Sequence, residues 1–181
     1  MKNFAKPVIC FYGTYDKTFT SNQLIKRGLE ENDIKVVEVN HEIKITDLNK
    51  KSDMGWHKMI WRILRKAGLI TETIKQRKLI QESDVIYVGF PGHFDVIPAW
   101  ITAKIFGKKL VFNPLVIFYT GFADDHNFLK KASAMGMLFK WGESLIYSLC
   151  DIVFADTLEQ KKHMHRLFGI PLNKIEDLPI G

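Results

Sequence analysis

Two loops of this chain carry side chains that could move a proton. His93 follows Pro91 and Gly92, and an imidazole donates or accepts a proton near neutral pH. Asp124 and Asp125 are adjacent carboxylates in a later loop, where they could act as a base or accept a hydrogen bond from a hydroxyl group. They could equally begin the next helix, because carboxylates stabilise a helix N-terminus. The candidate catalytic residues are therefore His93, Asp124 and Asp125.

A second set of candidates lies where predicted strands give way to helices or loops, and these residues could bind substrate. The loop that starts at Gly13 precedes a helix, whose first N–H groups could hold an anion. It lacks the Gly-x-Gly-x-x-Gly sequence of dinucleotide cradles, so an ordinary strand-to-helix turn remains open. Thr157 could likewise do no more than begin the last helix. The candidates are Gly13, Thr14, Tyr15, Gly92, His93, Tyr119, Asp156 and Thr157.

Much of the net charge of +6 comes from one basic region, residues 50–78, which suits an anionic partner. Apolar residues within 56–67 recur at helical spacing. This segment is therefore either a core helix beneath a solvated basic face or a helix on a membrane surface. In the second case Arg62, Arg65 and Lys66 would contact an acidic membrane or an anionic acceptor. No nucleic-acid-binding motif is visible, so we expect no nucleic-acid partner.

Six short apolar runs alternate with helix-length segments, and no tight hairpin signal joins any two of them. This alternation predicts an α/β fold: a Rossmann-like, doubly wound parallel sheet of about six strands, in the order 3-2-1-4-5-6, with helices on both faces. Ligands bind outside the carboxyl ends of the strands in such sheets, so the candidate loops should meet at one edge. The predicted strands are 8–12, 35–39, 85–90, 110–112, 152–154 and 175–178.

The bulk composition is that of an ordinary globular domain. At 181 residues, the chain fits a single domain, 1–181, on a prior of roughly 150 residues per domain. No apolar run approaches the ~20 residues needed to cross a bilayer, and the N-terminus does not resemble a signal peptide. Cys10 and Cys150 are predicted to be buried free thiols, and no cluster has metal-ligand spacing. We expect a cytoplasmic protein, and a peripheral position on the inner face of the cell membrane is the further option.

The order of these segments resembles the N-terminal domain of a GT-B fold glycosyltransferase of the large group-1 (GT4-like) family. The similarity covers nearly the whole chain. It is clearest in five segments: Gly13-Thr-Tyr-Asp16 with the helix from Asn22, Gly89-Phe-Pro-Gly-His-Phe-Asp95, Phe112-Asn-Pro-Leu115, Asp151-Ile-Val-Phe-Ala-Asp-Thr157 and Pro179-Ile-Gly181. The chain departs from the pattern at Ser21 and His126, where relatives often carry arginine.

This resemblance implies a hexosyltransferase that takes a nucleotide-sugar as co-substrate and binds no metal or other cofactor. It adds Asn22 to the substrate-binding candidates. In the family, the N-terminal domain takes the acceptor, and a C-terminal domain binds the nucleotide-sugar, usually through a Glu-x7-Glu motif. That motif is absent from the sequence, so we expect a C-terminal glycosyltransferase domain as partner, from the same gene or a separate subunit.

The expected acceptor is a sugar, a lipid-linked saccharide or a polysaccharide, and an acidic membrane surface is a further expected partner. Without the C-terminal domain the chain should transfer little sugar. The alternative is a non-catalytic Rossmann-like module that binds a nucleotide or scaffolds a partner at a membrane. A dehydrogenase is disfavoured because the glycine fingerprint of dinucleotide binding is missing.

Overall fold

The computed structural model describes residues 6–15, 17–41, 68–121 and 134–179. Five candidates fall outside these ranges: Arg62, Arg65, Lys66, Asp124 and Asp125. The predicted helix over 56–67 also lies outside the described residues.

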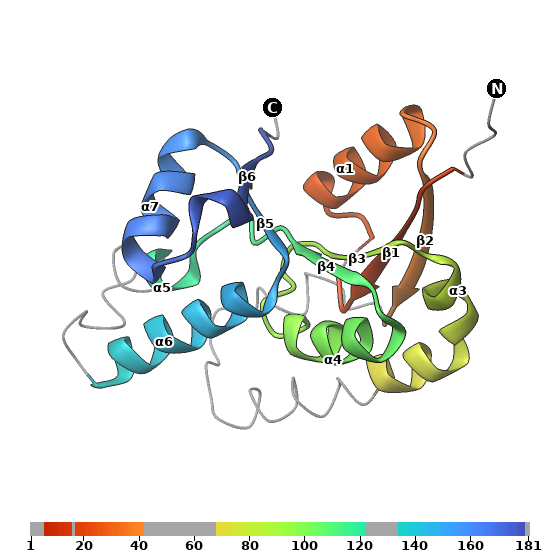
Figure 1. Ribbon diagram of the computed structural model, residues 1–181, viewed down its shortest axis with the longest axis horizontal. Helices are drawn as coiled ribbons and strands as arrows, with labels where there is room; N and C mark the ends of the chain where they lie inside the picture. The colour runs from red at the N-terminus through yellow and green to blue at the C-terminus, as the bar shows by residue number, and fades with distance from the viewer. Residues whose placement is uncertain (1–5, 16, 42–67, 122–133, 180–181) are drawn as a thin grey trace.

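Six parallel strands form one sheet, and helices lie on both of its faces (Figure 1). The strands are β1 (Val8–Gly13), β2 (Lys35–Asn40), β3 (Val85–Val88), β4 (Lys109–Phe112), β5 (Ile152–Ala155) and β6 (Ile175–Asp177). The helices are α1 (Thr20–Glu31), α3 (Arg77–Glu82), α4 (Val96–Phe106), α5 (Phe118–Thr120), α6 (Ala134–Leu149) and α7 (Leu158–Phe168), with a 3-10 turn at Leu172–Lys174 and a further helical stretch at 68–75. The predicted Rossmann-like α/β class is confirmed.

The two faces of the sheet are covered by different helices. In Figure 1, α1 and α7 lie on one side, and α3, α4 and α6 lie on the other. Side chains alternate along each strand, so neighbours such as Phe11 and Tyr12 enter different hydrophobic cores. The smaller core, under α1, centres on Phe11, Tyr15 and Tyr87. The larger core lies under α3, α4 and α6.

The strand order is β2-β1-β3-β4-β5-β6, so the predicted order 3-2-1-4-5-6 is wrong in the position of one strand. β3 pairs with β1 and β4 and does not lie beyond β2. The residues explain this difference. β3 is apolar throughout and almost fully buried, as a central parallel strand should be, whereas in β2 half-exposed and buried positions alternate. β2 is therefore suited to the edge of the sheet.

This order fixes where the winding of the sheet reverses. The chain passes from β1 to β2 on one side and then crosses back to β3 on the other side of β1. In open α/β sheets, ligands bind at such a reversal, beyond the carboxyl ends of the strands. The loops that follow β1 and β3 are therefore the first place to look for a site.

Cys10 and Cys150 are both buried and free, as the sequence predicts. Burial raises the pKa of the Cys10 thiol to about 12, with only partial opposition from the Val39 backbone. A thiol with so high a pKa is almost wholly protonated at neutral pH and is a poor nucleophile. Both cysteines are therefore packing residues.

Candidate substrate-binding site

A buried carboxylate joins the loops that follow β1 and β3. Asp95 accepts a hydrogen bond from the Thr14 N–H (2.8 Å to Oδ2) and another from the Thr14 hydroxyl (2.8 Å to Oδ2). Gly13 leaves room for this contact, because a Cβ there would lie 3.1 Å from Asp95 Oδ2 and its φ of 144° disfavours other residues. Asp95 occupies the N-cap position of α4, yet its side chain makes no capping bond. Two of the predicted candidates, Gly13 and Thr14, therefore help to build the edge of the sheet.

Two glycines bring the β3 loop close to its surroundings. A Cβ on Gly92 would lie less than 3.0 Å from both Val88 Cγ1 and the Gly89 carbonyl oxygen. A Cβ on Gly89 would lie less than 3.0 Å from Asn22 Oδ1. Gly92 is thus needed for tight packing, since its φ is not in the left-handed region. The loop also contains a cis peptide bond before Pro91.

The Asn22 side chain connects the start of α1 to this loop through its amide nitrogen, while its amide oxygen makes no hydrogen bond to a described residue. Its amide Nδ2 donates to the Phe90 carbonyl oxygen (2.6 Å). Its Oδ1 is buried and has no hydrogen-bond partner among the described residues. An unpaired buried carbonyl costs free energy, so native structures rarely leave one without a partner. The predicted candidate Asn22 therefore presents an acceptor that a ligand could satisfy.

Two more buried polar atoms at this edge, Tyr87 Oη and Asp156 Oδ1, also lack a hydrogen-bond partner among the described residues. The other buried polar atoms of this kind are the two ring nitrogens of His93 and Glu38 Oε2, which lies 2.6 Å from Lys17 Nζ. Burial raises the pKa of Tyr87, the Asn113 amide opposes this effect, and the charge of Asp156 adds to it. Asn113 and Asp156 therefore lie near the Tyr87 hydroxyl. Burial also raises the pKa of Asp156.

The placement of these residues follows from the alternation of side chains along the strands. Gly89, Asn113 and Asp156 each come two positions after a residue of the α1-side core, namely Tyr87, Val111 and Phe154. They should therefore continue the same face of the sheet beyond the ends of β3, β4 and β5. Asp156 is one of the candidates predicted from the sequence, whereas Tyr87 and Asn113 are not. Counting in steps of two from each strand would have found both.

The loop after β4, which begins at Asn113, is held in an uncommon backbone conformation. The Asn113 side chain accepts a hydrogen bond from the Leu115 N–H (3.1 Å). Leu115 has a φ of 60°, which is unusual for a residue other than glycine. Gln160 of α7 donates to the Leu115 carbonyl oxygen (3.2 Å), and its amide oxygen accepts from the Asp156 N–H. The Asn113 side chain of the loop itself and the Gln160 side chain of α7 thus hold this backbone, as is common at functional sites.

Thr157 begins α7, which is the simpler of its two predicted roles. Its hydroxyl accepts a hydrogen bond from the Gln160 N–H (3.1 Å), which is a helix N-cap. Asp156 instead directly follows β5, so its position continues the alternation of side chains along that strand. Thr157 therefore caps a helix, whereas Asp156 belongs to the edge of the sheet.

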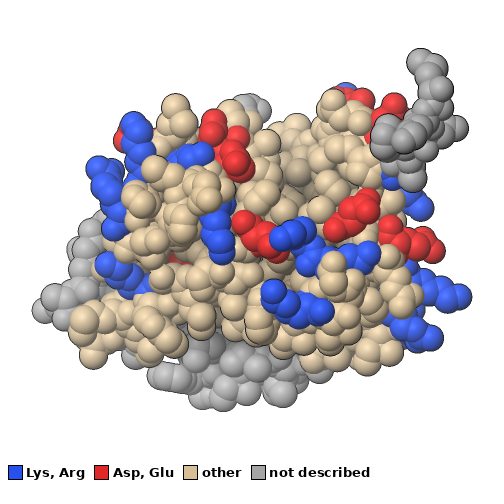
Figure 2. Space-filling model, in the orientation of Figure 1, with Lys and Arg blue, Asp and Glu red and all other residues tan. Residues whose placement is uncertain are grey.

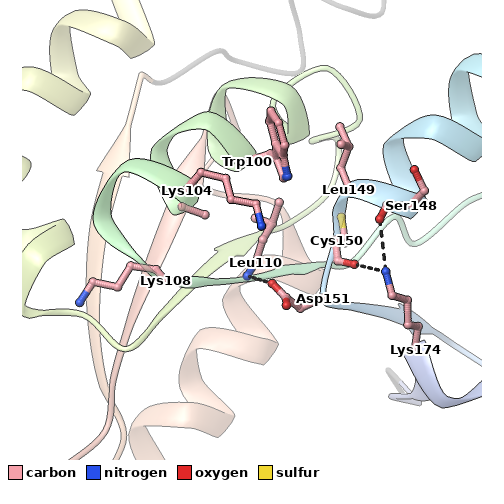
Figure 3. Close-up of a pocket in the computed structure, with 10 residues that line it drawn as sticks. Trp100, Lys104, Lys108, Leu110, Ser148, Leu149, Cys150, Asp151 and Lys174 are labelled. Atoms are coloured by element: carbon pink, nitrogen blue, oxygen red, sulfur yellow. Dashed lines mark hydrogen bonds between the residues drawn. The ribbon is translucent and has the colours of Figure 1, made fainter.

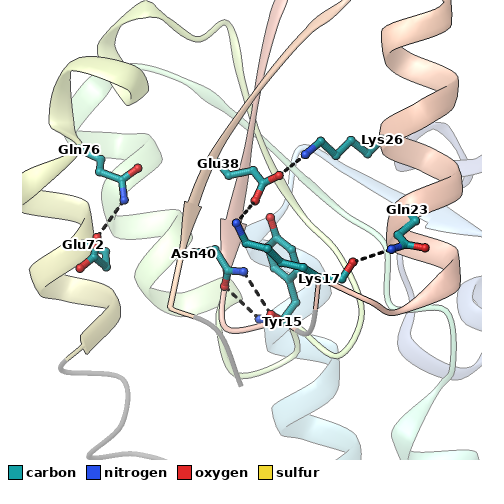
Figure 4. Close-up of polar contacts among 8 residues, drawn as sticks. All are labelled: Tyr15, Lys17, Gln23, Lys26, Glu38, Asn40, Glu72 and Gln76. Atoms are coloured by element: carbon teal, nitrogen blue, oxygen red, sulfur yellow. Dashed lines mark hydrogen bonds and ion pairs between the residues drawn. The ribbon is translucent and has the colours of Figure 1, made fainter. Parts of the chain in front are cut away.

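A pocket of about 240 Å³ lies between α1 and the strands β1 and β2. Figure 4 shows Glu38 paired with Lys17 (2.6 Å) and Lys26. It also shows the Asn40 side chain, which accepts a hydrogen bond from the Tyr15 N–H and donates one to the Tyr15 carbonyl oxygen. Burial raises the pKa of Glu38, but the two lysines outweigh this effect and hold it below the usual range. Two predicted candidates line this pocket together with Gln23 and Arg27: Tyr15 and Asn22.

His93 lies inside the protein. Its ring is only 2% exposed, stacks on Phe118 with a centroid distance of 3.6 Å, and places Nε2 3.5 Å from Glu143 Oε1. Glu143 also accepts hydrogen bonds from the Phe118 N–H (2.8 Å), the Tyr119 N–H (2.7 Å) and the Tyr147 hydroxyl (2.6 Å). The structure thus brings the candidates His93 and Tyr119 together, around a carboxylate that the sequence analysis missed.

The buried position of Glu143 determines its charge. Burial raises its pKa, but contacts with His93, the Tyr147 hydroxyl and the Tyr119 N–H outweigh this effect and hold the pKa below its usual value. The carboxylate is therefore ionised while it joins α6, α5 and the loop after β3. The signal in the sequence was a lone acid in an otherwise apolar helix, at Trp141-Gly-Glu-Ser-Leu145.

A second pocket, also about 240 Å³, lies at the amino-terminal edge of the sheet (Figure 3). Lys174 donates there to the carbonyl oxygens of Ser148 (3.2 Å) and Cys150 (3.1 Å). Burial raises the pKa of Asp151, but the Leu110 N–H and Lys109 lower it more. These polar groups have partners within the protein, whereas Asn22 Oδ1, Tyr87 Oη and Asp156 Oδ1 at the opposite edge have none among the described residues.

Among the described residues, no group of three or more His, Cys, Asp or Glu side chains could hold a metal ion. None of the described helices has both the length and the apolarity that a membrane span requires.

Comparisons with known proteins relate this chain to others by structure alone. Its sequence matches no protein-family model and no curated protein. Its structure is similar to that of Anabaena Alr3699/HepE in complex with UDP and glucose, with a TM-score of 0.51 and 13% identity over 97% of this chain and 44% of that chain. The complex of the same protein with UDP has a TM-score of 0.51 and 11% identity over the same shares. The chain therefore shares its fold with less than half of HepE.

Proposed function

We propose that this chain is the acceptor-side half of a GT-B glycosyltransferase that transfers a hexosyl group from a nucleotide-sugar to an acceptor. The observation that carries the proposal is a set of buried polar atoms at the carboxyl edge that have no hydrogen-bond partner among the described residues: Asn22 Oδ1, Tyr87 Oη and Asp156 Oδ1. Two of them, the amide and carboxylate oxygens, can only accept hydrogen bonds when Asp156 is ionised. A saccharide offers several hydroxyl donors close together and can satisfy such a set.

The similarity to HepE supports the same proposal. HepE was crystallised with UDP and with glucose, and this chain shares its fold. Because the chain spans 44% of that protein, we propose that a C-terminal domain, from the same gene or a separate subunit, supplies the remaining contacts to the nucleotide-sugar. Group-1 membership remains a proposal that rests on the sequence segments given above.

The chemistry divides between the two halves. Transfer requires an acceptor hydroxyl held at the anomeric carbon while the charge of the leaving diphosphate is neutralised. We assign Asn22 and Asp156 to the binding of acceptor hydroxyls. Asp124 and Asp125 remain our candidates for the base. Arg62, Arg65 and Lys66 remain candidates for contacts with an anionic or lipid-linked acceptor.

The structure argues against direct proton transfer by His93. The imidazole is buried between Phe118 and Glu143, and it also contacts Phe112 and Tyr147 of the larger core. We therefore assign it a positioning role, in which it helps to fix the loops that follow β3 and β4. His93→Ala should lower stability together with transfer.

The test is sugar transfer by the full gene product, with labelled UDP-glucose and other nucleotide-sugars and a membrane lipid extract as acceptor. Asp156→Ala should lower kcat/KM by about tenfold or more, because a hydrogen bond to a charged group is worth about 1.5–3 kcal/mol. Asp177→Ala is the matched control, since Asp177 pairs with Ala155 at the end of the neighbouring strand and is more exposed. It should leave transfer unchanged.

Two results would contradict the proposal. Equal rates for the Asp156→Ala and Asp177→Ala variants would remove Asp156 from the site. Binding of a nucleotide with no transfer to any acceptor would favour the alternative, a non-catalytic nucleotide-binding module.

A further inference from the structure

Helix α4 has apolar residues on all sides, with Thr102 and Lys104 as its only polar residues, yet only one of its sides is buried. Val96, Ala99 and Ala103 pack on the sheet. Ile97, Ile101 and Ile105 recur every four residues and are 47%, 48% and 72% exposed. A helix that is apolar all round is normally covered by protein or lipid. These isoleucines therefore indicate a surface with an occupant.

Helix α6 carries a similar stripe. Leu138 and Trp141 are 59% and 65% exposed, and Leu145 continues the stripe one turn further on. α6 contacts α4 and lies on the same side of the sheet (Figure 1). We call the exposed apolar side chains of the two helices the α4/α6 face: Ile97, Ile101, Ile105, Met137, Leu138, Phe139, Trp141 and Leu145.

This concentration is a property of one part of the surface. Among the described residues, eight of the fifteen exposed large apolar side chains belong to the α4/α6 face. In Figure 2 the surface at the lower left, where Figure 1 places α6, is almost entirely tan. Scattered single apolar residues need no explanation, but a gathered set marks an interaction site.

The charges of the two helices select the kind of occupant. Their charged side chains are Lys104, Lys140 and Glu143, and Glu143 is buried at 5% exposure. The α4/α6 face is therefore apolar with lysines and no exposed carboxylate. A second copy of the chain that docked through the same face would offer these lysines no exposed carboxylate from its own α4 or α6. An anionic lipid surface offers partners to both the lysines and the apolar side chains.

We propose that the α4/α6 face docks on an acidic lipid bilayer, with Trp141 and the isoleucines at the boundary between headgroups and acyl chains. α1 and α7 lie on the other side of the sheet, so this orientation leaves them facing away from the lipid. The proposal goes beyond sugar transfer and does not depend on it. A protein with no transferase activity could use the same face.

The test is co-sedimentation of the full chain with vesicles of phosphatidylcholine alone or mixed with phosphatidylglycerol. The wild type should bind the mixed vesicles more tightly. The double variant Leu138→Glu, Trp141→Glu should bind them about tenfold or more weakly, because it removes two large apolar side chains from the contact. Leu158→Glu on α7 is the matched control, since Leu158 is also 59% exposed, and it should bind as the wild type does.

A second pair of variants keeps the test decisive if the double variant does not fold. Lys104→Glu and Lys140→Glu should weaken binding to the mixed vesicles and leave binding to neutral vesicles unchanged. The proposal fails if the wild type does not sediment with mixed vesicles, or if Leu158→Glu weakens binding as much as the double variant. It also fails if the wild type is a dimer that the double variant dissociates, because a second copy would then be the occupant.

Discussion

Replacement of Glu143 by alanine is expected to lower the free energy of unfolding by about 3–5 kcal/mol, as does the loss of one partner from a buried charged network. The carboxylate accepts hydrogen bonds from the N–H groups of Phe118 and Tyr119 and from the Tyr147 hydroxyl. All three donors would lose this acceptor, and His93 would lose its neighbouring charge. Urea unfolding followed by circular dichroism measures the change.

The matched control is Glu159→Ala, which removes an exposed carboxylate whose ion-pair partner is Lys162. We expect no measurable change for this variant, because exposed pairs contribute little. Comparable losses for the two variants would show that Glu143 does not hold α5 and α6 together.

The same carboxylate predicts a pH dependence. The folded-state pKa of Glu143 lies below its ordinary value of 4.5, so its stabilising contribution is complete above that pH and is lost as the pH falls through the folded-state pKa. Glu143→Gln should remove this contribution. Its stability should therefore fall less steeply than that of the wild type below pH 4.5. Parallel curves in that range would contradict the assignment.

Gly92→Ala is expected to destabilise the fold by about 3 kcal/mol, at the upper end of the usual cost of overpacking. The new Cβ would lie less than 3.0 Å from Val88 Cγ1 and from the Gly89 carbonyl oxygen. A backbone oxygen cannot rotate away as a side chain can, so the β3 loop itself would have to move. Thermal unfolding should show the loss as a lower midpoint.

Gly28→Ala provides the opposite case within the same protein. Gly28 lies inside α1, and nothing lies within 4 Å of a Cβ built there. Alanine favours a helix over glycine by about 1 kcal/mol, so this variant should be more stable than the wild type. If Gly92→Ala matched Gly28→Ala, the tight packing of the β3 loop would be disproved.

The sheet could be predicted because its signals are local. Most of the strands are short runs rich in apolar residues, and helices lie between them. Two of these helices end at Gly107 and Gly169, both of which adopt positive φ. The position of β3 was missed because strand order depends on contacts between distant segments. The alternating pattern of β2 did contain the signal, since it is typical of an edge strand.

The candidate site was predictable only in part, for a physical reason. The loops could be placed at one edge because parallel strands end together. Whether a loop side chain points outward depends on what packs over it, and this is decided by residues far along the chain. Asp95 meets Thr14 across 81 positions, and His93 is enclosed by Phe118 and Glu143. Periodicity within one segment carries no information on such contacts.

The most direct test of the central claim is an NMR titration of the ¹⁵N-labelled chain with glucose, galactose, mannose, N-acetylglucosamine and UDP-glucose. We predict that at least one of these ligands shifts the signals of Asn22, Gly89, Asn113 and Asp156 at the carboxyl edge and leaves Lys104 and Lys174 at the opposite edge unchanged. Shifts confined to the pocket around Lys104 and Lys174, or no shift with any of the five ligands, would contradict the account.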